Sequence, residues 1–408
     1  MQFICALDIG TSKIRAILVK NENGAPKIIG VLNQNVSGLR HGAIIDLEEV
    51  NKSLLKIFSE IKNIEKRVLK NIYVNIGTTE SGIETSTAAT GIAAGDSEIS
   101  EEEIEKVKKL SEAINLGPNR IILHSIPQEF IIDGVGGISD PLGLSGNRLE
   151  IKSLIINVFS PHLKNLTKVV SLCGGRPKGI IFNPISSARS SLSKNQKELG
   201  VILIDFGAGT TSLAIYLENK LLHAKILPVG SANITSDIAV GLKIPYEVAE
   251  KIKIEQGVAF PKEVGSRETI DLSSFLGGER NIISKKFLAE IIEARLDEIF
   301  ELVNKELKVC GKNIELSSGA VLVGGGAKMK GLTNLAKNNL KLSVQIGSPI
   351  SENFIFDEDN EEFKNVLNDP EYANALGLVL WAIFYEKWMP ANSSFIDRIK
   401  KMFSYFNP

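Results

Sequence analysis

The sequence has few of the side chains that build disulfide frameworks or metal sites. Its 408 residues include three cysteines (Cys5, Cys173 and Cys310) without C-x-x-C spacing, and four histidines that lie far apart. This pattern supports neither a disulfide-rich secreted domain nor a zinc site. We therefore expect a protein of a reducing compartment.

Neither sign of charge dominates the chain. It carries 47 basic and 48 acidic residues, for a formal net charge of −1. Nucleic-acid binding normally requires a basic excess, so we expect no nucleic-acid partner. No apolar run approaches the roughly 20 residues that cross a bilayer, and the longest, Ala375 to Tyr385, predicts a buried helix. Asp8 interrupts the first apolar run and no signal peptide is evident, which favours a cytoplasmic location.

The length and the order of patterns predict several domains of the α/β class. A chain of 408 residues exceeds one typical domain of about 100–200 residues. Continuous apolar strands such as Val201 to Ile204 alternate with helical patterns such as Leu47 to Val68. Ser100 and Glu103 form a capping-box signature for another helix. Strands that alternate with helices indicate an α/β fold.

An internal repeat organises the chain. Ala6 to Thr11 (ALDIGT) and Leu203 to Ala208 (LIDFGA) each combine an apolar strand, an Asp, one further residue and a Gly, followed by a turn into another strand. The copies lie about half a chain apart, as expected for two related lobes that face a shared cleft.

Each Asp-x-Gly turn has the residue types that bind phosphate. Backbone N–H groups at such a turn cradle an anion, and glycine lets the chain approach it closely. The Ser and Thr hydroxyls add donors, and the lysine offers a charge for a β- or γ-phosphate. The carboxylates of Asp8 and Asp205 suit a hydrated Mg²⁺. One copy alone would be read as an ordinary hairpin turn; two matched copies favour a site. The predicted phosphate-binding residues are Asp8, Gly10, Thr11, Ser12, Lys13, Asp205, Gly207, Gly209, Thr210 and Thr211.

A third glycine-rich turn, Gly324 to Gly326, also follows an apolar strand. A nucleoside or its phosphates bind at such a turn when a helix follows it. A triple glycine alone is more often a tight turn. Its significance here comes from the two turns that precede it.

These motifs carry a family resemblance. DIGTSK (Asp8 to Lys13), DFGAGTT (Asp205 to Thr211) and VGGGAKMKG (Val323 to Gly331) resemble the two phosphate motifs and the adenosine motif of the actin/Hsp70/hexokinase superfamily. Four further stretches resemble the bacterial cell-division protein family FtsA. They are SGLRHGAIIDLEEV, HSIPQEFIID, DPLGLSGNRLE and TSDIAVGL. The most family-specific part is IPQEF together with PLGLSGNRLE.

The resemblance implies an actin-like two-lobed fold with duplicated RNase H-like sheets and an extra subdomain inserted in the first lobe. The implied parts are a first lobe core (1–81 and 160–198), its inserted subdomain (82–159), a second lobe core (199–238 and 312–385), a second insertion (239–311), a linker (386–394) and a terminal helix (395–408).

The resemblance also implies an ATP site with Mg²⁺. Glu250 and Lys253 would approach the ribose and base, although as a sequence pattern they also fit an exposed ion pair. The adenine pocket would be walled by Gly324, Gly325, Gly326, Ala327 and Met329. Relatives carry a carboxylate where this chain has Ser212 and Asn183, and neither side chain is a general base near neutral pH. We therefore expect ATP binding with slow or negligible hydrolysis.

The last residues predict a membrane-binding helix. Ser394 and Asp397 form an N-terminal cap, and the apolar side chains that follow share an arc of roughly 120° with cations beside it. This is typical of a helix in a membrane interface with anionic lipids, although an amphipathic terminal helix also packs on its own protein. The apolar residues are Phe395, Ile396, Ile399, Met402, Phe403 and Phe406, and the cations are Arg398, Lys400 and Lys401.

The family's partners and location follow only from the resemblance. Lys286 and Arg295, on the helix after Ser284, would bind the C-terminal peptide of the ring protein FtsZ, or else form a solvated helix face. The implied protein polymerises with itself on the inner face of the cytoplasmic membrane at the division site, where it anchors the FtsZ ring and meets other divisome proteins.

Three other functions share the superfamily motifs. A small-molecule kinase of the same fold needs a catalytic carboxylate that the motifs do not supply. An Hsp70-type chaperone needs more chain after Tyr385 than remains. A pilus-assembly adaptor of the PilM type is the third, and the IPQEF stretch counts against it.

Overall fold

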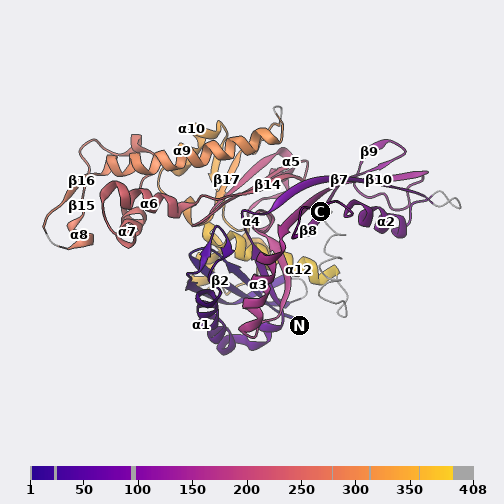
Figure 1. Ribbon diagram of the computed structural model, residues 1–408, viewed down its shortest axis with the longest axis horizontal. Coiled ribbons are helices and arrows are strands. Elements are labelled where there is room, and N and C mark those ends of the chain that lie inside the picture. Colours follow the sequence, from indigo (N-terminus) through magenta and orange to yellow (C-terminus); the bar gives the residue numbers. More distant parts are fainter. Residues whose placement is uncertain are drawn as a thin grey trace.

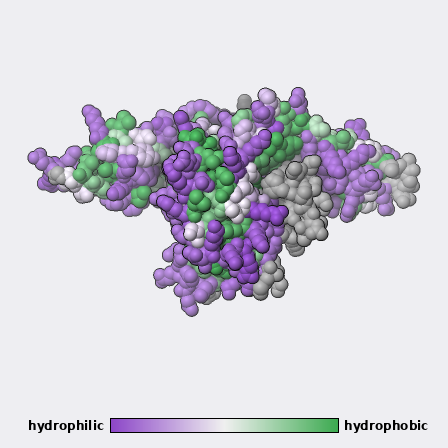
Figure 2. Space-filling model, turned by 60° about the horizontal axis from the view of Figure 1, so that its bottom comes forward, coloured by the Kyte–Doolittle hydropathy of each residue, from purple (hydrophilic) through white to green (hydrophobic). Residues whose placement is uncertain are grey.

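The computed structural model describes residues 2–22, 25–92, 98–277, 279–311, 314–357 and 359–388. In Figure 1 the molecule has the shape of a T, with two arms that extend from a central part and a stem below it. In the view of Figure 2, hydrophilic residues cover much of the stem and both arms, and hydrophobic areas between them are interrupted. Within these ranges no helix combines the length and apolar character needed to span a membrane. The expected membrane helix, 395–408, lies outside the described residues.

The stem contains a five-stranded sheet of order β11-β6-β1-β2-β3. Strands β1, β2 and β3 pair antiparallel in sequence order, whereas β6 pairs parallel with both β1 and β11. Its strands are β1 (Gln2–Ile9), β2 (Lys13–Glu22), β3 (Ala25–Asn35), β6 (Ile72–Ile76) and β11 (Pro177–Phe182).

A second five-stranded sheet, of order β14-β13-β12-β17-β18, repeats this topology. Strands β12, β13 and β14 pair antiparallel in sequence order, and β17 pairs parallel with both β12 and β18. Its strands are β12 (Val201–Phe206), β13 (Thr211–Leu217), β14 (Lys220–Leu227), β17 (Ala320–Val323) and β18 (Val344–Ile346). The duplicated sheets and the two-lobed α/β fold expected from the internal repeat are confirmed.

The two repeated turns have the same geometry. In the first, the Gly10 N–H donates to the Lys13 carbonyl at 2.9 Å, and in the second the Gly207 N–H donates to the Thr210 carbonyl at 2.9 Å. The register matches as well, because Asp8 pairs with Arg15 and Asp205 pairs with Ser212. Arg15 and Ser212 therefore occupy equivalent positions.

Five helices pack around the first sheet and the junction between the lobes. Helix α1 begins after Asp46, whose side chain accepts hydrogen bonds from the Glu48 and Glu49 N–H groups, and it buries its apolar face against the sheet. The helices are α1 (Leu47–Glu65), α3 (Ser160–Leu172), α4 (Asn183–Ser191), α5 (Lys194–Leu199) and α12 (Ala373–Trp388). A two-stranded ribbon of β4 (Leu39–Arg40) and β5 (Ala43–Ile44) precedes α1, and a short 3-10 turn, η1 (Lys66–Lys70), follows it.

Helix α12 departs from the expected domain scheme. The resemblance assigns residues 312–385 to the second lobe core, but α12 packs on α4 and on β1, β2 and β6 of the first sheet. A Cβ at Gly377 would lie 1.9 Å from the Ser186 carbonyl oxygen, so only glycine allows α12 to approach α4 this closely. The helix also continues to Trp388, so residues 386–388 are helical rather than part of a linker.

Two insertions form the arms of the T (Figure 1). The first is a four-stranded sheet of order β7-β10-β8-β9 covered by α2, with its own small apolar core. The Ser100–Glu103 capping box at the start of α2 is confirmed. Its elements are β7 (Gly82–Gly91), α2 (Glu101–Ser111), β8 (Arg120–Ile132), β9 (Val135–Ile138) and β10 (Arg148–Phe159).

The second insertion is mainly helical, and its long helix α9 packs against α6 and α10. Its elements are α6 (Ser231–Leu242), α7 (Tyr246–Gln256), η2 (Pro261–Glu263), β15 (Thr269–Asp271), α8 (Ser273–Leu276), β16 (Ile282–Ser284) and α9 (Lys285–Val309). The remaining elements after β17 are η3 (Gly325–Lys328), α10 (Leu332–Leu340), η4 (Ser351–Asn353), α11 (Glu361–Asn368) and η5 (Pro370–Tyr372).

Candidate functional site

The two Asp-x-Gly turns meet between the lobes. A Cβ at Gly209 would lie 2.7 Å from the Thr11 methyl group, so the tips of the two turns touch. His41 strengthens this junction, because its Nδ1 lies 3.2 Å from the Gly209 carbonyl oxygen. Turns separated by half the chain thus face one another, as the internal repeat predicts.

Asp8 is buried at the end of β1, with 4% of its surface exposed. Its Oδ1 accepts hydrogen bonds from the side-chain amides of Asn75, at 2.8 Å, and Asn374, at 2.9 Å. Burial raises the pKa of Asp8 to about 6, and the nearby charge of Asp205 adds to the rise while Arg15 opposes it. The two predicted metal-binding carboxylates are therefore close enough to repel one another.

Asp205 lies between the connecting helix and the third glycine-rich turn. Its Oδ2 accepts a hydrogen bond from the Ser187 hydroxyl of α4 at 2.7 Å. Burial raises the pKa of Asp205, while the Ser187 hydrogen bond and Arg15 oppose the rise. A Cβ at Gly324, where φ is +84°, would lie 2.3 Å from Asp205 Oδ1. The predicted adenosine turn therefore abuts the second phosphate turn, and only glycine fits at its first position.

Arg15 is the main residue beside the two carboxylates that the motifs missed. Its side chain is only 11% exposed, and its Nη1 lies 3.5 Å from Asp8 Oδ2. It also forms an ion pair with Glu371. A sequence signal existed: Arg15 is the lone charge in the apolar run Ile14 to Val19, and a seven-residue hairpin separation places it opposite Asp8.

Glu371, in η5, binds three cations of the candidate site. Its Oε1 accepts from Arg15 and from Lys13 Nζ at 3.2 Å, and its Oε2 accepts from Lys328 Nζ at 2.9 Å. Burial alone would raise the pKa of Glu371, but Arg15, Lys328 and Lys13 together lower it to about 2. The carboxylate is therefore ionised and links the first phosphate turn to the adenosine turn.

The adenosine turn also contacts η5, which precedes α12, and the second phosphate turn. The Gly324 N–H donates to the Pro370 carbonyl at 2.9 Å, and a Cβ at Gly326 would lie 2.8 Å from Phe206 Cβ. Ala327 is buried, Met329 is half-buried in the second core and Gly325 is exposed. Gly324 and Gly326 are thus held against β12.

Glu250 and Lys253 do not form an exposed pair. Only 7% of the Lys253 side chain is exposed, and its Nζ donates to Glu250 Oε2 at 2.7 Å and to the Thr235 hydroxyl at 2.8 Å. Burial lowers the pKa of Lys253, and Glu250 partly offsets that effect. Lys253 Nζ also reaches the Ser231 carbonyl at 3.2 Å, at the first turn of α6. The Ser231 N–H in turn donates to Gly207, so this network borders the second phosphate turn.

The hydroxyl groups of the two phosphate turns differ in what they contact. Thr211 is fully buried and donates to the Val229 carbonyl at 2.8 Å, and Thr210 is also buried. Ser12 is exposed, and Thr11 and Lys13 are half-buried. The first turn therefore offers the more accessible donors.

The residues present fit a nucleotide with a hydrated Mg²⁺. Within the described ranges, the Asn183 and Asn374 side-chain oxygens are buried without a hydrogen-bond partner, as expected where a ligand or its water completes the contacts. At Gly209, Gly324 and Gly326 an added Cβ would overlap neighbouring protein atoms, so these glycines let the three turns pack closely. No carboxylate stands at the positions of Ser212, which is buried beside Asp205, or Asn183.

The predicted partner-peptide residues lie on α9, far along the chain from both phosphate turns. Lys286 is exposed. The Arg295 guanidinium binds both carboxylate oxygens of Asp237 on α6, at 2.6 and 2.9 Å, and Glu298 at 2.5 Å. A peptide carboxylate would have to compete with these partners for Arg295.

Comparisons with known proteins match almost the whole chain. A family model described as "Cell division protein FtsA" matches residues 202–377, and one described as "SHS2 domain inserted in FTSA" matches residues 81–157. The FtsA of Pseudomonas aeruginosa is 32% identical over 383 residues, which cover 94% of this chain and 89% of that protein. The FtsA of Borreliella burgdorferi is 33% identical over 380 residues, which cover 93% of this chain and 90% of that protein.

Solved structures of more distant proteins share the fold. The PilM-PilN type IV pilus biogenesis complex matches with a TM-score of 0.64 at 16% identity, over 93% of this chain and 98% of that one. MreB5 of Spiroplasma citri bound to ADP matches with a TM-score of 0.55 at 16% identity, over 95% and 98%. These likenesses show the actin-like fold alone. The two family models and the relatives at 32% and 33% identity show that the chain belongs to the FtsA family of cell-division proteins.

Proposed function

We propose that this FtsA-family protein binds ATP between its two lobes and polymerises on the inner face of the cell membrane, where it anchors the FtsZ ring. The observation that carries the nucleotide proposal is the contact between the two Asp-x-Gly turns at Thr11 and Gly209. Asp8 and Asp205 end the strands that lead into these turns, and their carboxylates would face each other between the lobes. The MreB5 neighbour, a protein of the same fold, was solved with ADP and with AMPPNP.

Each part of the cleft has a proposed role toward the nucleotide. Asp8 and Asp205 would hold a hydrated Mg²⁺, which needs only one or two carboxylates. The N–H groups of both turns, with Lys13 and Arg15, would bind phosphate oxygens. Lys253 and Glu250 would approach the ribose from α7. A bound Mg·ATP would supply negative phosphate charge and a divalent cation, and the residues of both turns that bind them would favour the closed arrangement of the lobes, a population shift rather than turnover.

The proposed hydrolysis rate is low. Ser212 and Asn183 stand where a carboxylate could orient or deprotonate water, and neither acts as a general base near neutral pH. A single-turnover measurement of phosphate release tests this directly. Release on the timescale of seconds would show that another group activates water.

The membrane part of the proposal rests on the sequence of residues 395–408. Full burial of a large apolar side chain contributes about 1.5–3 kcal/mol, and a cation beside anionic lipid about 1 kcal/mol. Interfacial burial is partial and the segment must fold as it binds, so one copy would be a weak anchor. A polymer presents many tethered copies, whose avidity would make attachment firm.

Co-sedimentation with anionic liposomes tests the anchor. At 100° per residue Phe403 lies within the apolar arc, whereas Ser404 lies opposite it. Phe403→Glu should abolish pelleting, and Ser404→Glu, which adds the same charge to the polar face, should reduce it only slightly. Each is measured with and without ATP. Equal pelleting of Phe403→Glu and the unaltered chain would contradict the anchor.

A further inference from the structure

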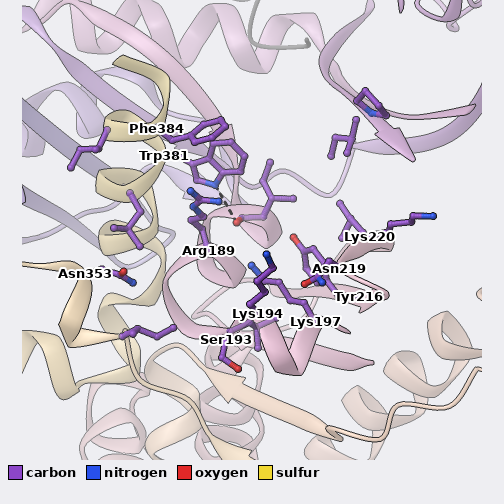
Figure 3. A pocket seen from close by; sticks show the side chains of 18 of the residues that line it. Arg189, Ser193, Lys194, Lys197, Tyr216, Asn219, Lys220, Asn353, Trp381 and Phe384 are labelled. Atoms are coloured by element: carbon purple, nitrogen blue, oxygen red, sulfur yellow. Dashed lines mark hydrogen bonds between the residues drawn. The ribbon is translucent and has the colours of Figure 1, made fainter. Parts of the chain in front are cut away.

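A cavity of about 1070 Å³ lies apart from the candidate nucleotide site. The first lobe, the inserted subdomain, the second lobe and α12 all contribute to its wall (Figure 3). None of the residues assigned above to phosphate, metal or adenosine lines it. Its volume slightly exceeds the usual range for small-molecule sites, about 300–1,000 Å³.

Two cations line this cavity without a carboxylate partner among the described residues. The Arg189 guanidinium of α4 lies 5.5 Å from the Trp381 ring centre and 5.1 Å from that of Phe384, both on α12. Lys197 Nζ of α5 lies 5.1 Å from the Tyr216 ring centre. Such aromatic contacts stabilise a cation but do not neutralise its charge.

The surroundings make these two charges costly. Burial lowers the pKa of Lys197 to about 8, and the like charge of Arg189 contributes to this shift. Burial also lowers the pKa of Arg189. Lys194 and Lys220 add two more cations to the lining, against a single carboxylate, Glu218. An anion bound here would relieve this excess of positive charge.

The cavity separates its polar and apolar walls. In Figure 3, Trp381 and Phe384 lie on one side, Lys194, Lys197 and Lys220 lie on the other, and Arg189 lies between them. Aliphatic side chains, among them Ile185, Leu192, Leu221 and Leu380, complete the lining. A ligand that matches this lining has a charged head and an apolar body.

A peptide that adds a strand fits less well. The edge strand β3 borders the cavity at Pro26, and this edge is already bridged by Ile355. The Ile28 N–H donates to the Ile355 carbonyl at 2.9 Å, and the Ile355 N–H donates to the Pro26 carbonyl at 2.8 Å. Strand addition at this edge would require those bonds to break.

We propose that the cavity binds an anionic amphiphile, whose phosphate or carboxylate head lies between Arg189 and Lys197 and whose acyl chain lies along Trp381 and Phe384. Two sources share this chemistry, a membrane phospholipid and a free fatty acid. The proposed membrane anchor follows α12 in the sequence, so the phospholipid source, though not the cavity itself, rests on the proposed function.

Fluorescence titration of the full chain tests the proposal. The chain has two tryptophans, and in a Trp388→Phe background the tryptophan emission, excited selectively over tyrosine, comes from Trp381 alone. The probes are dioctanoyl phosphatidylglycerol, dioctanoyl phosphatidylcholine and decanoate, each kept below its micelle concentration so that the terminal helix meets no bilayer. We expect saturable binding of phosphatidylglycerol or decanoate, with the tighter of the two identifying the source, and at least tenfold weaker binding of the zwitterionic lipid.

Matched variants connect that binding to the two cations. The double variant Arg189→Gln/Lys197→Gln should weaken anion binding at least tenfold. The control Lys164→Gln/Lys168→Gln, on the exposed face of α3, changes the net charge equally and should leave anion binding unchanged. If the first pair does not fold, Lys194→Glu at the exposed rim should weaken binding about fivefold. ATP affinity should be the same in all of these variants, so loss of ATP binding throughout would count against the proposed nucleotide function and not against this site.

Three results would overturn the proposal. They are equal binding of the anionic and zwitterionic lipids, unchanged binding by the Arg189→Gln/Lys197→Gln variant, and saturation by an acidic leucine–glutamate peptide with no response to either anionic amphiphile. The last result would identify the cavity as a protein-docking site.

Discussion

Replacement of Glu371 by glutamine should destabilise the free protein and yet tighten ATP binding. The amide keeps the side-chain volume but removes the charge that Arg15, Lys13 and Lys328 share. If these cations serve the nucleotide, Glu371 occupies them as an internal anion in its absence. The free variant therefore lacks the ion-pair network that stabilises the protein. In the variant, ATP also no longer competes with the Glu371 carboxylate for these cations.

The exposure of each partner sets the expected size of the two effects. Arg15 and Glu371 are 11% and 17% exposed, and breaking a buried pair on one side costs about 3–5 kcal/mol. Arg15 keeps Asp8 at 3.5 Å, so its charge is not left unpaired, and we expect a loss of about 2 kcal/mol in the free energy of unfolding. Lys13 and Lys328 are 44% and 43% exposed, and solvent screening makes their share small. Release of Arg15 and Lys13 should strengthen ATP binding about tenfold, or 1.4 kcal/mol.

Urea unfolding of the free protein and calorimetric titration with Mg·ATP measure the two quantities. Arg15→Gln is the matched variant, since it removes the other partner of the same ion pair. It should lower both stability and ATP affinity, because it leaves Asp8 and Glu371 without their shared cation. The reasoning fails if Glu371→Gln weakens ATP binding as Arg15→Gln does, because Glu371 would then support the nucleotide rather than compete with it.

Three further predictions concern the cleft and its surroundings. Gly324→Ala should lower the free energy of unfolding in urea by more than about 2 kcal/mol, because φ is +84° and the new methyl would overlap Asp205. Gly91→Ala is the control: its methyl meets open space, so the free energy of unfolding should change by less than about 0.5 kcal/mol. Thr235→Val should cost about 1–3 kcal/mol in the same assay, since it removes the hydroxyl bonded to Lys253 and Glu250; an unchanged midpoint would show that this network adds nothing. Arg295→Ala should lower both the stability of the protein and its affinity for the FtsZ C-terminal peptide, measured by a binding titration. Lys286→Ala should lower only the affinity. Unchanged peptide binding by both variants would exclude α9 as the peptide site.

The parts of the fold that follow local rules could be predicted from the sequence. Asp-x-Gly after an apolar strand specifies a tight hairpin, and its repetition predicted two related sheets. The capping box of Ser100 and Glu103 predicted the start of α2 for the same reason, because both partners lie within one turn of helix. The geometry of these features depends on residues close in sequence.

Features that depend on distant contacts could not be predicted in this way. Glu371 is 356 residues from Arg15, and nothing in its neighbourhood marks it as the partner of three cations. The apolar pattern of α12 predicted burial but not which lobe it covers; the contact of Gly377 with α4 decides that. Lys253 resembled an exposed lysine because only tertiary packing places Thr235 and the Ser231 carbonyl around its ammonium group.

A crystal structure of the full chain grown with Mg²⁺ and a non-hydrolysable ATP analogue tests the central claim most directly. The account predicts triphosphate density between the turns that begin at Asp8 and Asp205, the metal beside both carboxylates, and Glu371 withdrawn from Arg15. Nucleotide bound elsewhere, or a cleft whose Arg15–Glu371 ion pair remains closed at saturating analogue, would contradict it.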